Sequence, residues 1–471
     1  MKYNIILPAV ASAMVILNSC DIEMVPKGMT TLDTTTELEY ILNTATITDK
    51  PFHDISIIVN ESYGDDYQTP VPRKALQSNT LMRAYLAYDE SVDRASLAAN
   101  DQRYNTTYNM INSMNVVIAK APGCDGDEDH KKQIVAEART MRAYYHFIIA
   151  AIYAQQYDDA TAANNGGIAY VTDYNTSEKK IQLPLDQVYR CILDDLSDEN
   201  LDLLPERNNV VRCSRYTGYA IKARVLLQMK HYSEALTYAL KALEGNRTIE
   251  DRSSIKQTKK WVLRSTSPNN FIYISPMSTQ SAVNYEQLSV ETVALFEPGD
   301  LTKDFAKNNN APLYNEAYGS GDSGVPGCVE LTSYNVFTNV WGLTVERTMY
   351  NAAECYIRTG EIQKGLDMIN EIRELRIDPD VYQPFAATTE AEAMKLLQDA
   401  KFIECLATYE NFFDRKRWNS EDKYKATITR WLPVSQNPDE CQFSIRPESP
   451  LWVIPFPVSV IANNDSFTQN Y

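Results

Sequence analysis

The sequence predicts a mainly helical protein, built on a tetratricopeptide-like helical-repeat scaffold that one long irregular region interrupts. Apolar residues recur at three- and four-residue spacing through much of the chain, which is typical of amphipathic helices. A helix–turn–helix pattern also occurs twice, far apart in the chain. Residues 247–345 differ: they are rich in Asn, Ser, Thr, Pro and Gly, and they carry scattered aromatics with little helical period. Long irregular segments on a rigid scaffold are where binding surfaces tend to be found.

The apolar period places helices in several segments. They are 103–120, 130–156, 185–204, 216–229, 232–245, 347–358, 361–376 and 390–415. Four carboxylates within 125–129 precede the second of these, where they favour the positive end of the helix dipole. A calcium-binding EF-hand starting at Asp125 is disfavoured, because it needs glycine at His130 and glutamate at Ala136. We therefore interpret these acids as a helix start.

Two helical hairpins resemble each other at an offset of 130 residues. They occupy 219–243 and 349–375. The offset matches Ala223 to Ala353 and Ala235 to Gly365, so that small residues stand where the two helices of each hairpin must approach closely. Any helical hairpin needs small residues at its crossing, but the spacing favours a tetratricopeptide-like repeat.

The chain begins with an apolar run, residues 5–17, that is too short for a membrane span of about 20 residues and is typical of a secretory signal. The run ends on Leu-Asn-Ser-Cys, which resembles a bacterial lipobox and makes Cys20 the predicted lipid anchor. An ordinary signal with an incidental cysteine is the alternative. The predicted organisation is a signal peptide at 1–19, an anchor and N-terminal segment at 20–50, and a helical domain at 51–471.

A net charge of −17 disfavours nucleic acid and anionic lipid headgroups as partners, since both are polyanions. Of the eight cysteines, one is assigned to lipid, so the remaining number is odd and at least one must be free or pair between chains. Their pairing stays open. Cys191, Cys355 and Cys405 lie in helical apolar patterns, which predicts small buried side chains.

Several patterns that resemble chemical motifs lack the context that the chemistry needs. The loop 319–327 contains both G-x-G-x-x-G and G-D-S-G, but no strand precedes it and the chain is helical. His146 lies in an apolar helix, which predicts a hydrogen-bonded core histidine rather than a metal ligand. Carboxylates are plentiful and none is singled out. We therefore predict no catalytic residue, no metal site and no cofactor.

Four segments, taken in order, resemble the SusD/RagB family of nutrient-binding outer-membrane lipoproteins. They are YNTTYNMINSMNVVIAKAPG (104–123), AEARTMRAYYHFIIAAIYAQQY (136–157), FFDRKRW (412–418) and LWVIPFPVSVIANNDSFTQNY (451–471). The chain departs from the family pattern at 154–156, 402–405 and 409–411. The charged residues of these segments are expected to form ion pairs between helices or to cap carbonyls; they are Arg139, Arg142, Asp414, Arg415 and Arg417. The segment Ile454–Pro457 is expected to close the repeat stack.

The resemblance implies a non-enzymatic binding lipoprotein of the outer membrane, facing the cell exterior. Such a protein captures an oligosaccharide and delivers it to a SusC-like TonB-dependent transporter. The alternatives are a RagB-like peptide-binding protein, a surface glycan hydrolase, and a purely structural lid of the transporter.

The predicted ligand contacts pair aromatic rings with short polar side chains. They are Tyr67, Tyr314, Tyr318 and Trp341 for stacking, with Asp65, Asp66 and Asn315 as polar partners. For each ring, an ordinary core or surface role is the alternative. Neither 64–67 nor 314–318 contains Arg or Lys to hold an anionic group, which favours a neutral glycan over a peptide.

Overall fold

The computed structural model describes residues 32–43, 46–47, 53–63, 76, 79–253, 267–276, 287–303, 329–330, 339–432 and 438–471. This part of the chain is mainly helical with a few short strands, as the sequence predicts. Within it, no helix combines the length and apolarity needed to cross a membrane.

The longer helices are α1 (Thr35–Leu42), α6 (Gln102–Lys120), α7 (Glu128–Tyr153), α8 (Leu185–Asp195), α10 (Arg215–Gln228), α11 (Tyr232–Gly245), α15 (Val345–Arg358), α16 (Ile362–Arg373), α17 (Glu390–Glu404) and α18 (Glu410–Asn419). Short helices are α2 (His53–Ile58), α4 (Leu81–Leu86), α5 (Arg94–Leu97), α9 (Asp198–Leu201), α13 (Val290–Val293) and α19 (Val458–Asn463). The strands are β1 (Thr46–Ile47), β2 (Asn270–Ile272), β3 (Ser275–Pro276), β4 (Gln287–Leu288), β5 (Val329–Glu330), β6 (Leu343–Thr344), β7 (Ile428–Trp431) and β8 (Gln442–Ile445). The pairs β2–β6, β4–β5 and β7–β8 are antiparallel, and β1–β3 is parallel.

Two predicted helices are each divided in the structure. The segment 185–204 forms α8 and α9, and 390–415 forms α17 and α18. Between the latter two, Ala407 has a left-handed φ of 59°, and its N–H donates to the buried carboxylate of Glu61, 2.6 Å away. A distant side chain thus takes a donor that a continuous helix would use, so the break is not visible in the local apolar period.

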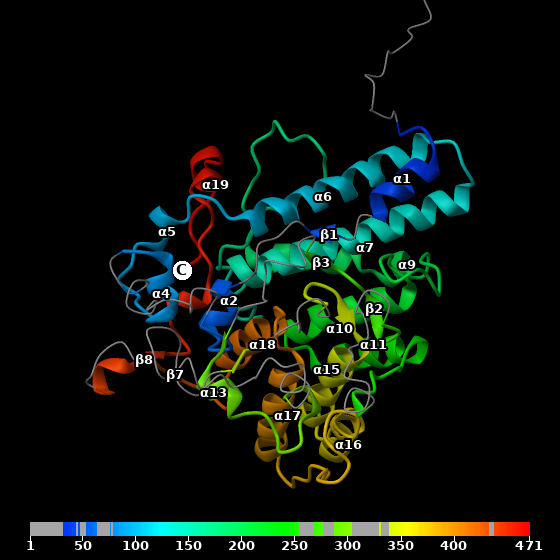
Figure 1. Cartoon of the computed structure of the whole chain (residues 1–471). Coiled ribbons are helices and arrows are strands. Elements are labelled where there is room, and N and C mark those ends of the chain that lie inside the picture. The colour runs from blue at the N-terminus through cyan, green and yellow to red at the C-terminus, as the bar shows by residue number, and fades with distance from the viewer. Residues whose placement is uncertain are drawn as a thin grey trace, which may run out of the picture.

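The helical hairpins α10–α11 and α15–α16 stack side by side beneath the long α6–α7 pair (Figure 1). Gly365 on α16 lies so close to α15 that an added Cβ would stand 2.7 Å from the carbonyl oxygen of Ala353. Ala223 and Ala235 of the first hairpin are also buried. The predicted small residues therefore lie at helix crossings, and the tetratricopeptide-like scaffold is confirmed.

Local signals at α7 are also confirmed. The Asp127 carboxylate accepts the N–H groups of Asp129 and His130 at the start of the helix, 3.1 and 2.9 Å away. His146 is fully buried; its Nδ1 donates to the Arg142 carbonyl and its Nε2 accepts the Val171 N–H, both over 2.9 Å. Burial lowers its pKa to about 3, so the ring is neutral and structural.

The predicted ion pairs join helices through the core. Asp195, at the end of α8, accepts hydrogen bonds from Arg139 and Arg142 of α7, while Arg417 of α18 binds Glu354 of α15 with both terminal nitrogens. Cys355 and Cys405 are buried as predicted, whereas Cys191 is only partly buried.

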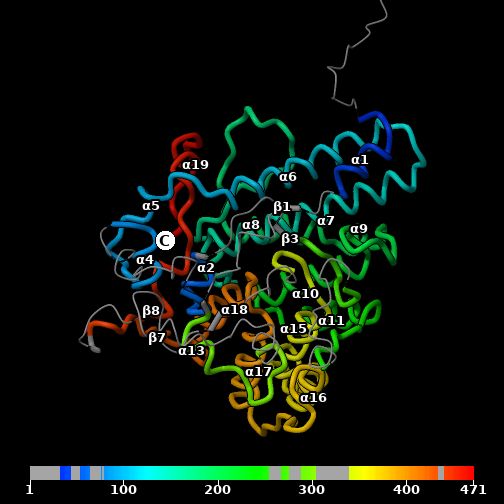
Figure 2. Tube along the Cα trace, viewed as in Figure 1, coloured from blue at the N-terminus to red at the C-terminus, as the bar shows by residue number. Residues whose placement is uncertain are grey.

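The C-terminal segment returns to the N-terminal part of the molecule, beside α4 and α5 (Figure 2). The Val458 N–H donates to the Ala98 carbonyl, 2.8 Å away. Phe456 stacks on Tyr153 with the ring centroids 5.9 Å apart, and Asn470 donates to the Tyr153 carbonyl. The apolar end of the chain thus covers the C-terminal end of α7.

Candidate ligand-binding face

Most of the predicted contacts lie outside the described residues. They are Asp65, Asp66, Tyr67, Tyr314, Asn315 and Tyr318, together with the anchor Cys20 and the glycine loop 319–327. The segments that flank them are described, and their positions show where these parts of the chain begin and end.

Trp341 is described, and it is a core residue. Its side chain is almost wholly enclosed, at 2% exposure, and its ring packs edge-on against Tyr409 with the centroids 4.6 Å apart. The Tyr144 hydroxyl donates to the Trp341 carbonyl. A ring without an open face cannot stack on a sugar, so the stacking role predicted for Trp341 disagrees with its burial. Its apolar neighbours Val340 and Leu343 were the sequence signal for a buried segment.

Three distant parts of the chain meet at a small sheet. Leu288 of β4 pairs with Val329 of β5, and an isolated antiparallel bridge joins Leu288 to Ser62. The Tyr63 hydroxyl accepts the Val290 N–H, 3.0 Å away. We call residues 60–63 with β4 and β5 the loop-bearing face, because predicted contacts 65–67 follow Tyr63 and contacts 314–318 precede β5 along the chain.

A buried polar network holds this face to the scaffold. The Asn60 amide accepts from Arg430 Nε over 2.8 Å and donates to Glu291, while its carbonyl accepts from Thr292. Glu61 binds the Ala407 N–H and the Asn411 amide, 2.6 and 2.9 Å away. Sequence analysis missed these residues, because their partners stand hundreds of positions away and no spacing marks them.

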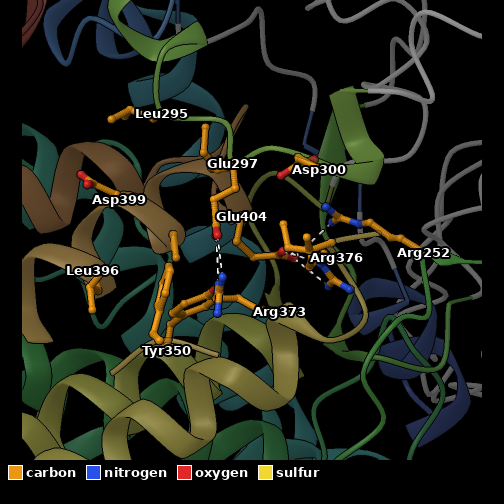
Figure 3. Close-up of a pocket in the computed structure, with 14 residues that line it drawn as sticks. Arg252, Leu295, Glu297, Asp300, Tyr350, Arg373, Arg376, Leu396, Asp399 and Glu404 are labelled. Atoms are coloured by element: carbon orange, nitrogen blue, oxygen red, sulfur yellow. Dashed lines mark hydrogen bonds and ion pairs between the residues drawn. The ribbon is translucent and has the colours of Figure 1, made fainter. Parts of the chain in front are cut away.

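A charged cavity of about 210 Å³ lies farther along the same chain segment. It is enclosed by α15, α16, α17 and residues 295–303, which follow α13 (Figure 3). The Leu301 N–H donates to the Arg376 carbonyl and the Asp378 N–H to the Gly299 carbonyl, over 2.9 and 2.8 Å. These bonds fix one wall of the cavity against the end of α16.

Arginines and carboxylates alternate around the charged cavity and pair with one another. Arg373 binds Glu297, and Arg376 binds Glu404 with an Nε to Oε2 distance of 2.7 Å (Figure 3). Arg252 reaches the same Glu404 over 3.2 Å. Burial alone would raise the pKa of Glu404, but the charges of Arg252 and Arg376 lower it to about 2. This carboxylate is therefore ionised at neutral pH.

The pKa of Asp300 shifts in the opposite direction to that of Glu404. Burial raises its pKa to about 6, and the charge of Arg252 opposes this only in part. Its Oδ1 accepts the Thr302 N–H over 2.8 Å. Tyr350 and Phe385 complete the lining, and the Arg373 guanidinium lies 3.3 Å from the Phe385 ring centroid. The cavity thus offers donors, acceptors and ring surface, and its paired charges leave no excess of cations.

No curated protein sequence matches this chain significantly. A family model described as "starch-binding associating with outer membrane", of the SusD-like type, matches residues 22–227.

Solved structures share the fold over almost the whole chain. A SusD superfamily protein from Bacteroides thetaiotaomicron has a TM-score of 0.67 at 15% identity, covering 93% of this chain and 100% of that one. A SusD-like protein from Bacteroides fragilis has a TM-score of 0.65 at 14% identity, covering 93% and 97%. A SusD-like carbohydrate binding protein from Bacteroides vulgatus has a TM-score of 0.65 at 13% identity, covering 93% and 98%.

These likenesses show that the chain has a helical-repeat fold of the SusD type. Residues 22–227 also match the SusD-like family model by sequence.

Proposed function

We propose that this protein is a non-enzymatic, lipid-anchored binding protein of the outer membrane that captures a neutral oligosaccharide on its loop-bearing face. The family model's description as starch-binding, and the carbohydrate-binding relative from Bacteroides vulgatus, support this ligand class. The captured glycan is delivered to a SusC-like TonB-dependent transporter.

The observation that carries the proposal is the meeting of Ser62, Leu288 and Val329 in one small sheet. Residues 65–67 follow Tyr63 and residues 314–318 precede Val329 along the chain, so one described flank of each segment lies at this sheet. Two aromatic-bearing segments that are each joined to the same sheet at one flank can contribute to one binding surface.

The charged cavity supports a neutral ligand rather than an anionic one. The guanidinium groups of Arg252, Arg373 and Arg376 are already paired with carboxylates. Paired charges still offer acceptor and donor atoms to sugar hydroxyls, whereas an anionic ligand would have to displace a carboxylate.

A glycan array and a peptide library, both tested with the soluble domain that starts after Cys20, decide the ligand class. We expect a neutral oligosaccharide to bind, and Tyr314→Ala to weaken binding by about 1–3 kcal/mol, the range of a lost hot-spot contact. Tyr40→Ala is the matched control, since Tyr40 is 68% exposed on α1, far from the loop-bearing face (Figure 1). Peptide binding with a silent array would overturn the ligand class, and release of shortened glycans would indicate a hydrolase.

The anchor and the delivery step have separate tests. Cys20→Ser should abolish labelling by a palmitate analogue, and equal labelling of variant and parent would contradict the lipid anchor. Co-purification of the native protein with a TonB-dependent barrel supports delivery. Normal glycan uptake in cells that lack this protein would contradict it.

A further inference from the structure

A second cavity of about 380 Å³ lies beside the C-terminal end of α18. It is enclosed by the end of α18, the residues that follow α7, the segment 447–453 and the C-terminal Tyr471. We call it the lysine cavity, because the buried residue Lys416 is part of its lining. It shares no lining residue with the charged cavity or with the loop-bearing face.

Lys416 is a buried amine without a counter-ion. Its Nζ donates to the carbonyls of Ala151 and Ala154 at the end of α7, 2.8 and 2.5 Å away. In the described part of the chain no carboxylate forms an ion pair with it, and burial lowers its pKa to about 7. An ammonium group has three donors, so one N–H is left after these two bonds.

Asn419, one turn farther along α18, also lines the lysine cavity and keeps an unused donor. Its side chain is 8% exposed, its Oδ1 accepts the Ala426 N–H, and its Nδ2 has no hydrogen-bond partner among the described residues. A buried donor without an acceptor costs free energy, about 1–3 kcal/mol. A ligand that supplies acceptor atoms would recover it.

The walls add ring surface. Trp452 lines the lysine cavity and spends its only donor, Nε1, on the Arg446 carbonyl over 2.9 Å, so that it offers carbon surface alone. Tyr471 is 40% exposed to solvent, and the Arg94 guanidinium lies 4.1 Å from its ring centroid. The lining also has one carboxylate side chain, Glu448, which is exposed and lies 3.8 Å from Lys425, while Tyr471 carries the terminal carboxylate of the described chain.

We propose that the lysine cavity is a second ligand site, which binds a carboxylate-bearing molecule of monosaccharide size, such as an acidic sugar. The unused buried groups are donors, and one of them, the Lys416 amine, has no carboxylate partner among the described residues. A carboxylate supplies acceptors to these donors and favours the protonated amine, and charge-assisted hydrogen bonds are the stronger kind. Of the two aromatic rings in the lining, Tyr471 at 40% exposure has open surface for the carbon face of a sugar, whereas Trp452 at 4% exposure is buried.

The test uses calorimetry to measure the affinity of the soluble domain that starts after Cys20 for D-glucuronate and for D-glucose. We expect glucuronate to bind at least about tenfold more tightly, and Lys416→Met to lose at least about tenfold in glucuronate affinity, as when one partner of a buried charge pair is removed. Lys395→Met is the matched control, because Lys395 is exposed on α17 and lines neither cavity. It should bind glucuronate like the parent.

Asn419→Ala is the second variant and keeps the proposal testable if Lys416→Met does not fold. Circular dichroism melting establishes folding before each titration. Equal affinity for glucose and glucuronate, no glucuronate binding, or full affinity in a folded Lys416→Met or Asn419→Ala variant would each overturn the site. Tyr314→Ala should leave glucuronate binding unchanged, which separates this outcome from that of the glycan-binding face.

Discussion

Two buried charge networks use the same residue types in different surroundings. Between α10, α15 and α18, Arg417 pairs with Glu354 and Arg224 with Glu410, and these side chains are sealed from solvent. Around the charged cavity, Arg373 pairs with Glu297, whose side chain is 28% exposed. The sealed network therefore only holds helices together. The cavity network leaves polar atoms beside an open volume, where a ligand can reach them.

The largest expected effect comes from opening the sealed network. Glu354→Ala removes the acceptor of both Arg417 terminal nitrogens and of Trp418 Nε1, all within 3 Å. Arg417 would keep only Asp414 as an ionic partner, 2.9 Å away, and breaking the buried pair with Glu354 should lower the free energy of unfolding by about 3–5 kcal/mol. Urea unfolding measures it.

Glu361→Ala is the control, since Glu361 is exposed and pairs with Lys364 over 3.2 Å. Exposed pairs contribute about 0–1 kcal/mol. Similar losses in both variants would show that the sealed network is no more critical than a surface pair.

The charged cavity should make the free energy of unfolding depend on pH. Burial raises the pKa of Asp300 to about 6, so its protonated form is favoured in the folded protein. Its contribution to stability is therefore present at low pH and is lost as pH rises from about 4 to 6, by roughly 3 kcal/mol for about two pKa units.

Asp300→Asn keeps the Oδ1 that accepts from Thr302 and cannot ionise. The variant should match the parent near pH 4 and exceed its free energy of unfolding by about 3 kcal/mol at pH 7. Urea unfolding of both proteins across this range checks it. A constant difference between them at all pH values would contradict the raised pKa.

The repeat scaffold depends on close helix contact as well as on charge. A Cβ at Gly365 would lie 2.7 Å from the Ala353 carbonyl oxygen and 2.6 Å from the Ile357 side chain. We expect Gly365→Ala to lower the free energy of unfolding by about 1–3 kcal/mol, as overpacking does. Thermal melting compares it with Gly123→Ala, where an added Cβ would meet no atom within 4 Å. A stable Gly365→Ala would mean that the crossing can widen freely.

The smallest expected change in stability is at the rim of the charged cavity. Asp399 lines the cavity and pairs with Lys395 one turn away on α17. Asp399→Asn should change the free energy of unfolding by less than about 0.5 kcal/mol, the contribution of an exposed helix pair. Calorimetry with the oligosaccharide identified on the array should nevertheless show weaker binding. Unchanged affinity would show that the charged cavity is not part of the glycan-binding surface.

The helical scaffold followed from the sequence because its signals are local. Apolar spacing located the helices, Asp127 marked the start of α7, and the match of Ala235 to Gly365 pointed to the crossing of α15 and α16. Each of these depends on residues within a few turns of one another, so the pattern can be recognised in the sequence itself. The buried histidine, His146, followed from the same apolar period.

Only the tertiary structure decided the break at Ala407 and the meeting of Ser62 with Leu288. The lysine cavity is of the same kind, because Lys416 and Tyr471 meet there from separate parts of the chain. In each case the environment of a side chain is set by residues far away in sequence. Its burial and charge balance are properties of the packed molecule, so no local spacing could reveal them.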